Sequence, residues 1–85
     1  MNQAIQFPDR EEWHDYTQAI VFPALVNGMQ MMCAIKSSVV AQRFGGNTPE
    51  DYLSLFRQHR WDLEEEAEQC IRRQEEDDQG VIWLS

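Results

Sequence analysis

An Asn27-Gly28 pair between two apolar runs is the feature that most constrains how this chain can fold. Both residues tolerate the positive φ angles of a type I′ turn, so the pair predicts a tight β-hairpin with strands at residues 19–26 and 29–36. Because a two-residue turn fixes the register, one face of the hairpin becomes apolar throughout and should cover the core. The opposite face is mixed, and we expect it to be half-covered or solvated. The expected core face pairs Ile20, Phe22, Ala24 and Val26 with Ile35, Cys33, Met31 and Met29.

Pro23 restricts what can lie beside the first strand of this hairpin. In the predicted register its missing N–H would point away from the second strand, so any third strand must be interrupted or bulged at this proline. We expect a short strand at residues 5–7. Between that strand and the hairpin, Asp9 and Glu12 match a capping box and predict a helical turn that includes Trp13.

A short helix is expected directly after the hairpin. Ser37 or Ser38 can cap it, and Gly45 can end it. Residues 39–44 also suit a strand, because two valines favour one. The hairpin is therefore followed either by a short helix or by a further strand.

One long helix is predicted from about residue 49 to about residue 74. Thr48 can cap it, a proline follows at its first position, and apolar residues recur along it at helical spacing. A bend is expected near His59, where the apolar stripe skips a step. An acidic loop then leads to a strand at residues 81–84. Helices grouped between strands define an α+β fold, a small antiparallel sheet packed on one long helix, in a single domain of residues 1–85.

The charge balance narrows the classes of partner. Seven Lys and Arg against fifteen Asp and Glu give a net charge of -8. Such a chain is poorly suited to neutralise nucleic-acid phosphates, and anionic membrane surfaces would repel it. No long apolar window or secretory leader is evident, so a cytoplasmic location is expected. Cys33 and Cys70 are expected to be reduced thiols that face the core.

Several stretches are similar to one known family: FPDREEW, FPALVNGMQ, RFGG, TPEDYLSLFRQHRWDLEEEAE, and EEDDQG before a terminal apolar strand. Together they resemble the domain of unknown function 1488 family, and within it the short acidic bacterial proteins, from Met1 to Ser85. The resemblance implies a bacterial setting and a His-Arg pair at residues 59 and 60. It implies no activity, substrate or cofactor, because the family has none assigned.

The segment around Arg60 offers one candidate binding site. On a helical projection His59 and Arg60 flank the two borders of the predicted core face, with Arg57 further around. In a structural interpretation, Arg60 lays its stem along the core and pairs with a carbonyl or carboxylate, while His59 is hydrogen-bonded at the other border. In a functional interpretation, the three residues form a basic notch that takes an anionic ligand.

Trp61 projects away from the apolar stripe and offers a second candidate site. It could pack on neighbouring side-chain stems or under the N-terminal segment. Left exposed, it would be of the residue type most enriched at interaction hot spots. The acidic run beside it is either a solvated face or a surface that steers a basic partner. That run comprises Glu64, Glu65, Glu66, Glu68 and Glu75 to Asp78.

Enzyme chemistry is hard to build from this sequence. No Ser or Cys lies in a nucleophile context, and the imidazoles are those of His14 and His59. Spacings typical of metal ligands are absent, so no catalytic residue, metal or cofactor is predicted.

The sequence instead favours a non-catalytic protein-interaction module that binds an unknown protein partner through Trp61 and the acidic helix. The alternative is an anionic small-ligand binder or minor enzyme built on Arg57, His59 and Arg60. We also expect a monomer or a weak homodimer, the latter formed along the outer edge of residues 81–84.

Overall fold

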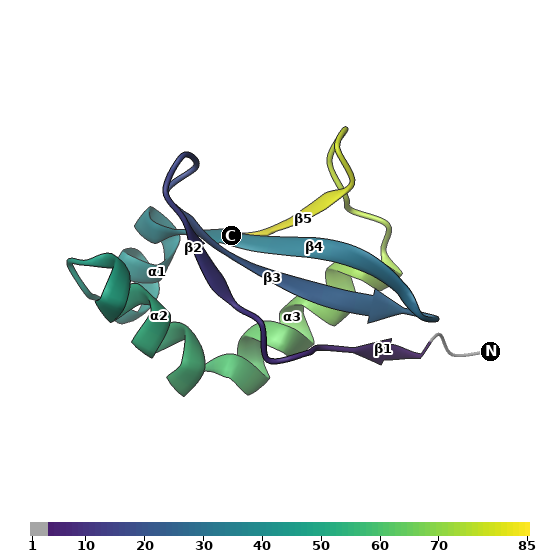
Figure 1. Ribbon diagram of the computed structural model, residues 1–85, viewed down its shortest axis with the longest axis horizontal. Coiled ribbons are helices and arrows are strands. Elements are labelled where there is room, and N and C mark those ends of the chain that lie inside the picture. Colours follow the sequence, from purple (N-terminus) through teal and green to yellow (C-terminus); the bar gives the residue numbers. More distant parts are fainter. Residues whose placement is uncertain (1–3) are drawn as a thin grey trace.

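The computed structural model describes residues 4–85, in which three helices lie against one face of a five-stranded sheet (Figure 1). The predicted α+β class is confirmed. Within the described residues, the other face of the sheet carries no helix. The elements follow the order β1 (Ile5–Gln6), β2 (Glu12–His14), β3 (Ala19–Val26), β4 (Met29–Lys36), α1 (Ser37–Phe44), α2 (Pro49–Gln58), α3 (Arg60–Arg72) and β5 (Val81–Leu84).

The β3–β4 hairpin has the predicted strands and the predicted register. Val26 pairs with Met29 across the turn, and the ladder continues to the far end of both strands. Asn27 and Gly28 have φ angles of 53° and 84°, as a type I′ turn requires. The hairpin therefore forms for the local reason that the sequence indicates.

Two short strands share the outer edge of β3. β2 pairs with residues 19–21 and β1 with residues 25–26, which leaves a gap at Pro23. The interruption predicted at this proline is confirmed. The helical turn predicted to include Trp13 is wrong, because Trp13 lies in β2 opposite Ile20. The edge of β3 before the proline offers a row of backbone partners, and a ladder outweighs one isolated capped turn.

The last strand, β5, runs parallel to β4, so the sheet is mixed and not wholly antiparallel as predicted. Met32 pairs with Val81, and Ile35 pairs with Leu84. The reason lies in the helices: α1 follows the end of β4 that is far from the hairpin turn, and α3 carries the chain back toward that turn (Figure 1). β5 must then start near the turn and run in the direction of β4.

The predicted long helix of residues 49–74 is two helices, α2 and α3, which meet at His59. This residue has φ -109° and ψ 19°, outside the helical range. The bend expected from the skipped apolar step is therefore a break. It lets α2 direct Phe56 and α3 direct Leu63 into one core.

The ends of the shorter elements follow the predicted signals with one exception. Thr48 caps α2, because its hydroxyl oxygen accepts a hydrogen bond from the Asp51 N–H at 3.1 Å. The strand alternative for residues 39–44 is wrong, since they belong to α1, which ends at Gly45. The exception is the start of α1: its N-cap is Lys36, and no side chain caps it, so neither predicted serine has that role.

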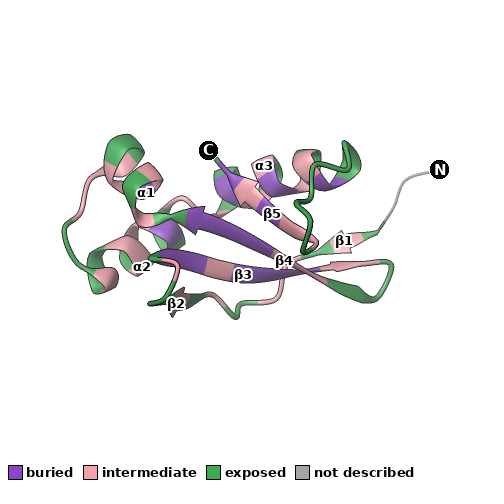
Figure 2. Cartoon of the chain, turned by 90° about the horizontal axis from the view of Figure 1, so that it is seen from above, coloured by how far each residue is buried: buried purple, intermediate pink, exposed green. Residues whose placement is uncertain are grey.

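The core lies between the sheet and the helices. Figure 2 shows buried residues along β3, β4 and β5 and at intervals on α3. Phe22 of β3 packs on Phe56 of α2, with ring centroids 4.9 Å apart. The opposite face of the sheet is less open than predicted, since Ala19, Pro23 and Ala34 are buried there. Small side chains on a sheet are readily covered by their longer neighbours. The core cluster comprises Ile20, Phe22, Ala24, Cys33, Ile35, Val40, Phe56, Leu63, Ala67, Ile71, Ile82 and Leu84.

Candidate functional site

The two arginines of the predicted basic notch converge on one carboxylate. Arg57 Nε donates to Glu11 Oε2 at 2.7 Å, and Arg60 Nη2 donates to Glu11 Oε1 at 2.5 Å. The Glu11 side chain is only 8% exposed. Arg60 also lies 3.4 Å from carboxylate oxygens of both Asp9 and Glu64. These ion pairs tie the segment before β2 to both α2 and α3.

Electrostatics hold Glu11 in its ionised form. Burial opposes the charge, but the hydrogen bonds from Arg57 and Arg60 outweigh it and lower the pKa of Glu11 to about 2. For Glu64, by contrast, burial raises the pKa of the carboxyl, and the hydrogen bond from Arg60 offsets only part of that effect. The Arg60 guanidinium carbon also lies 5.3 Å from the ring centroid of Phe56. Arg60 therefore packs against Phe56 at the border of the core and pairs with a carboxylate, as its structural interpretation predicts.

His59, the third member of the predicted notch, has a different environment. Its ring stacks on Phe44 of α1, with centroids 3.9 Å apart and planes inclined by 8°. Glu11 already occupies the position between Arg57 and Arg60 that an anion bridging the two would take. The geometry of this notch therefore lends no support to the anion-binding alternative.

Trp61 stands on the outer side of α3 and is 87% exposed. A shallow hollow of about 450 Å³ lies beside it, and every other residue that lines this hollow is acidic. The residues at positions 61, 64, 65 and 68 follow helical spacing, so they share one side of α3. We call the set that lines the hollow the acidic tryptophan face: Trp61, Asp62, Glu64, Glu65 and Glu68.

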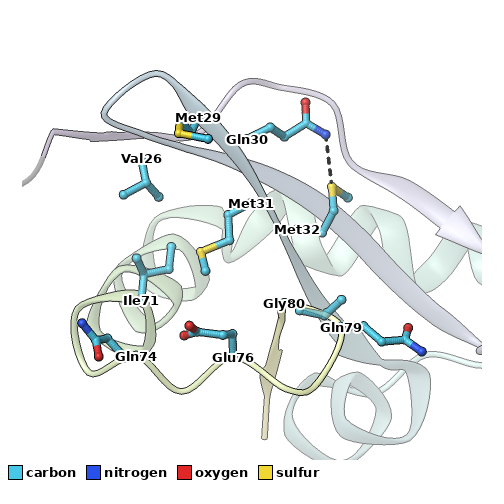
Figure 3. Close-up of a pocket in the computed structure, with 11 residues that line it drawn as sticks. Val26, Met29, Gln30, Met31, Met32, Ile71, Gln74, Glu76, Gln79 and Gly80 are labelled. Carbon is cyan, nitrogen blue, oxygen red and sulfur yellow. Dashed lines mark hydrogen bonds between the residues drawn. The ribbon is translucent and has the colours of Figure 1, made fainter.

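A groove lined with methionines is the feature that the sequence reasoning missed. It opens beside the hairpin turn, between β4, the end of α3 and the loop before β5, and has a volume of about 610 Å³ (Figure 3). Met29, Met31 and Met32 line it with Ile71 of α3. The signal was present in the run MQMM. Only the position of β5, which covers part of β4, decides that this run is left open.

The two thiols are poorly placed for nucleophilic chemistry. Burial, with a smaller contribution from Cys70, raises the pKa of Cys33 to about 12. Burial and a hydrogen bond with Glu75 raise the pKa of Cys70 as well. Both groups are therefore neutral thiols near neutral pH, and a neutral thiol is a weak nucleophile.

Residues 4–85, the part of the chain that the structure describes, hold no arrangement typical of a metal site or a membrane span. No group of three His, Cys, Asp or Glu side chains in this range is arranged to hold a metal ion. No helix in it is long and apolar enough to cross a membrane.

These features define a small α+β protein that has helices on one face of a mixed sheet, an acidic tryptophan face and an apolar groove. The family described as "Protein of unknown function (DUF1488)" matches residues 5–84, and the chain belongs to this family. The resemblance drawn from the sequence is therefore confirmed.

Similar proteins support the assignment. The chain is 66% identical over 84 residues to the uncharacterized protein YrdB of Escherichia coli (strain K12), which covers 99% of both chains. It is 64% identical over 84 residues to the uncharacterized protein YrdB of Shigella flexneri, again over 99% of both. The crystal structure of a DUF1488 protein of unknown function from Shewanella loihica PV-4 superposes with a TM-score of 0.91 at 38% identity, over 99% of this chain and 94% of that one.

Proposed function

We propose that this protein is a non-catalytic interaction module that binds a basic segment of a protein partner through its acidic tryptophan face. The observation that carries the proposal is the 87% exposure of Trp61. An indole left this far in solvent is of the residue type that dominates interaction hot spots.

The carboxylates around the indole define the chemistry of the partner. Glu64 and Glu68 are each engaged by an arginine of α3. Asp62 and Glu65 are exposed and form no ion pair with any residue in the described part of the chain. A Lys or Arg side chain laid over the ring of Trp61 would meet these two exposed carboxylates, of which Asp62 also interacts electrostatically with Arg43. Cation–π contacts of this kind contribute about 0.5–2 kcal/mol, more as water is excluded.

The overall charge supports the same partner. With a net charge of -8, the chain attracts basic molecules from beyond contact distance and repels acidic ones. Steering of this kind weakens as salt is added, because the Debye length shortens. The affinity for a basic segment should therefore fall as the ionic strength rises.

A binding measurement with matched variants tests the proposal. The probe is a short, fluorescently labelled peptide rich in arginine, titrated with the parent chain, with Trp61→Ala and with Trp61→Phe. Trp61→Ala should weaken binding by about tenfold or more, the size of a hot-spot loss, and Trp61→Phe should retain much of the affinity. A further variant, Glu65→Gln, should also weaken binding, whereas Glu12→Gln, which removes an exposed carboxylate of β2, should not and serves as its charge-matched control.

Two results would count against this function. One is a Trp61→Ala variant that binds the basic peptide as well as the parent chain does. The other is an affinity that does not depend on salt, since the acidic tryptophan face could not then be the surface that is recognised.

A further inference from the structure

The methionine-lined groove lies where one strand of the sheet outruns its neighbour. β5 pairs with β4 from Met32 to Ile35, whereas β4 itself begins at Met29. Within the described residues, no strand therefore lies beside the first residues of β4 on the side where β5 lies further along. We call this unoccupied position in the sheet the vacant lane. The groove of about 610 Å³ runs along this vacant lane (Figure 3).

The register of the hairpin fixes which backbone groups face that lane. Val26 and Met29 close a two-residue turn, so Met29 and Met31 direct their N–H and C=O groups toward β3. The intervening Gln30 directs its N–H and C=O groups the other way, into the vacant lane. Within residues 4–85, no backbone group pairs with Gln30 on that side. A donor and an acceptor of one strand edge are thus presented at the groove.

The side chains around the lane suit a second strand. Successive side chains of a strand point to opposite faces, so an added segment would meet two surfaces. On the helix side it would meet Met29, Met31 and Ile71, and on the other side Gln30 and Met32, all of which line the groove. Met29 is 75% exposed. Methionine side chains are flexible and polarisable, and they adapt to apolar groups of varied shape.

The charges near the groove indicate what else such a segment carries. Residues 29–32 have no charge, whereas the loop before β5 contains the run EEDD at residues 75–78. Asp77 is used internally, since its carboxylate accepts hydrogen bonds from the N–H groups of Gln79 and Val81 and from Trp83 Nε1. Glu76 instead lines the groove and is exposed. An apolar edge beside an exposed carboxylate complements a segment that combines apolar and basic residues.

We propose that this groove binds an extended segment of a partner protein, which adds a short strand to β4 at Gln30. Its apolar side chains pack against Met31, and a Lys or Arg side chain pairs with Glu76. This site is separate from the acidic tryptophan face and does not depend on it. The mode of binding is strand addition, in which backbone hydrogen bonds give affinity and alternate side chains give specificity.

Titration of the isotope-labelled chain by NMR with synthetic peptides tests this site. The first probe is a short capped peptide that alternates valine with lysine, and the second has glutamate in place of lysine. Two further probes are N-methylated at every valine or at every lysine, so that each lacks the donors of one strand edge. The lysine peptide should shift the backbone amide signals of Gln30 and Gly80, and the glutamate peptide should not. One of the two N-methylated peptides should bind at least about tenfold more weakly than the parent peptide, the loss expected when strand hydrogen bonds are removed.

Variants on exposed positions locate the binding without endangering the fold. Met29→Lys should weaken binding of the lysine peptide by about tenfold, because it places a like charge where an apolar contact is expected. Glu76→Gln should weaken it by about threefold, the usual size of an exposed ion pair, whereas Glu12→Gln should leave it unchanged. Trp61→Ala should leave the shifts of Gln30 and Gly80 unchanged, which separates this site from the acidic tryptophan face.

Four results would overturn the proposal. These are an absence of groove shifts at peptide concentrations on the order of 1 mM, shifts of Gln30 and Gly80 that disappear in Trp61→Ala, equal binding of all the N-methylated and unmodified peptides at the groove, and groove shifts that grow with protein concentration when no peptide is present. The last would show that a second copy of the chain fills the groove.

Discussion

Replacement of Glu11 by glutamine tests how strongly the N-terminal segment is tied to the helices. The carboxylate is 8% exposed and accepts hydrogen bonds from Arg57 and Arg60, which lower its pKa from the ordinary 4.5 to about 2. At about 1.36 kcal/mol per pH unit, that difference corresponds to about 3 kcal/mol of stability at neutral pH. A glutamine keeps the shape of the side chain and removes the charge. Glu11→Gln should therefore lower the free energy of unfolding by about 2–3 kcal/mol at pH 7, since the neutral amide retains part of the hydrogen bonding.

The pH dependence gives the sharper test, and its sign follows from the direction of the pKa difference. A depressed folded-state pKa contributes stability that is fully present above pH 4.5 and is lost as the pH falls toward about 2. The parent chain and Glu11→Gln should thus differ most near neutral pH and converge over this window. Urea unfolding followed by far-ultraviolet circular dichroism measures both curves, with Glu12→Gln as the exposed neighbouring control. The reasoning is refuted if the two glutamine variants are equally stable at pH 7, or if the loss in Glu11→Gln persists unchanged at the acid end.

Three further predictions concern other parts of the molecule. Gly46→Ala should destabilise the fold by at least about 1 kcal/mol, because Gly46 has φ +98° and an added Cβ would lie 3.0 Å from a methyl carbon of Leu55. Gly80→Ala should cost less in the same urea assay, because Gly80 also has a positive φ but an added Cβ there would meet no atom within 4 Å beyond its chain neighbours. Trp61→Ala should change the free energy of unfolding by less than about 0.5 kcal/mol, and a larger loss would show that the indole is structural. In mass spectrometry after mild alkylation, Cys70 should be modified before the fully buried Cys33, whose pKa is about 12, and both should react in urea; preferential reaction of Cys33 in the native state would contradict the described burial.

Local signals in the sequence predict the elements of this fold well. The Asn27-Gly28 turn, the cap at Thr48 and the gap beside Pro23 each depend on a few adjacent residues, and each is found as expected. The failures involve choices made over longer distances. The capping box at Asp9 gave way to a strand because the edge of β3 was available, which no local pattern records.

The same distinction applies to the candidate sites. Helical projection placed Arg60 at the border of the core and Trp61 on the outside, and both positions are observed. The carboxylate that occupies Arg60 comes from Glu11, far away in the sequence, and spacing alone could not identify it. The methionine-lined groove was missed for a related reason, since it exists only because β5 pairs with part of β4.

The parallel pairing of β5 with β4 also has a consequence for how the chain folds. The hairpin and each helix can form from contacts between near neighbours, but β5 joins β4 only after the whole segment of residues 37–80 has been looped out. The entropy lost in closing a loop grows with the logarithm of its length, so this is the most demanding pairing in the sheet. When β5 pairs, the side chains of Ile82 and Leu84 enter the core. Docking of β5 is therefore the step that joins the C-terminal strand to the hairpin. The folding rate of the chain should be governed by this long-range pairing more than by formation of the hairpin or the helices.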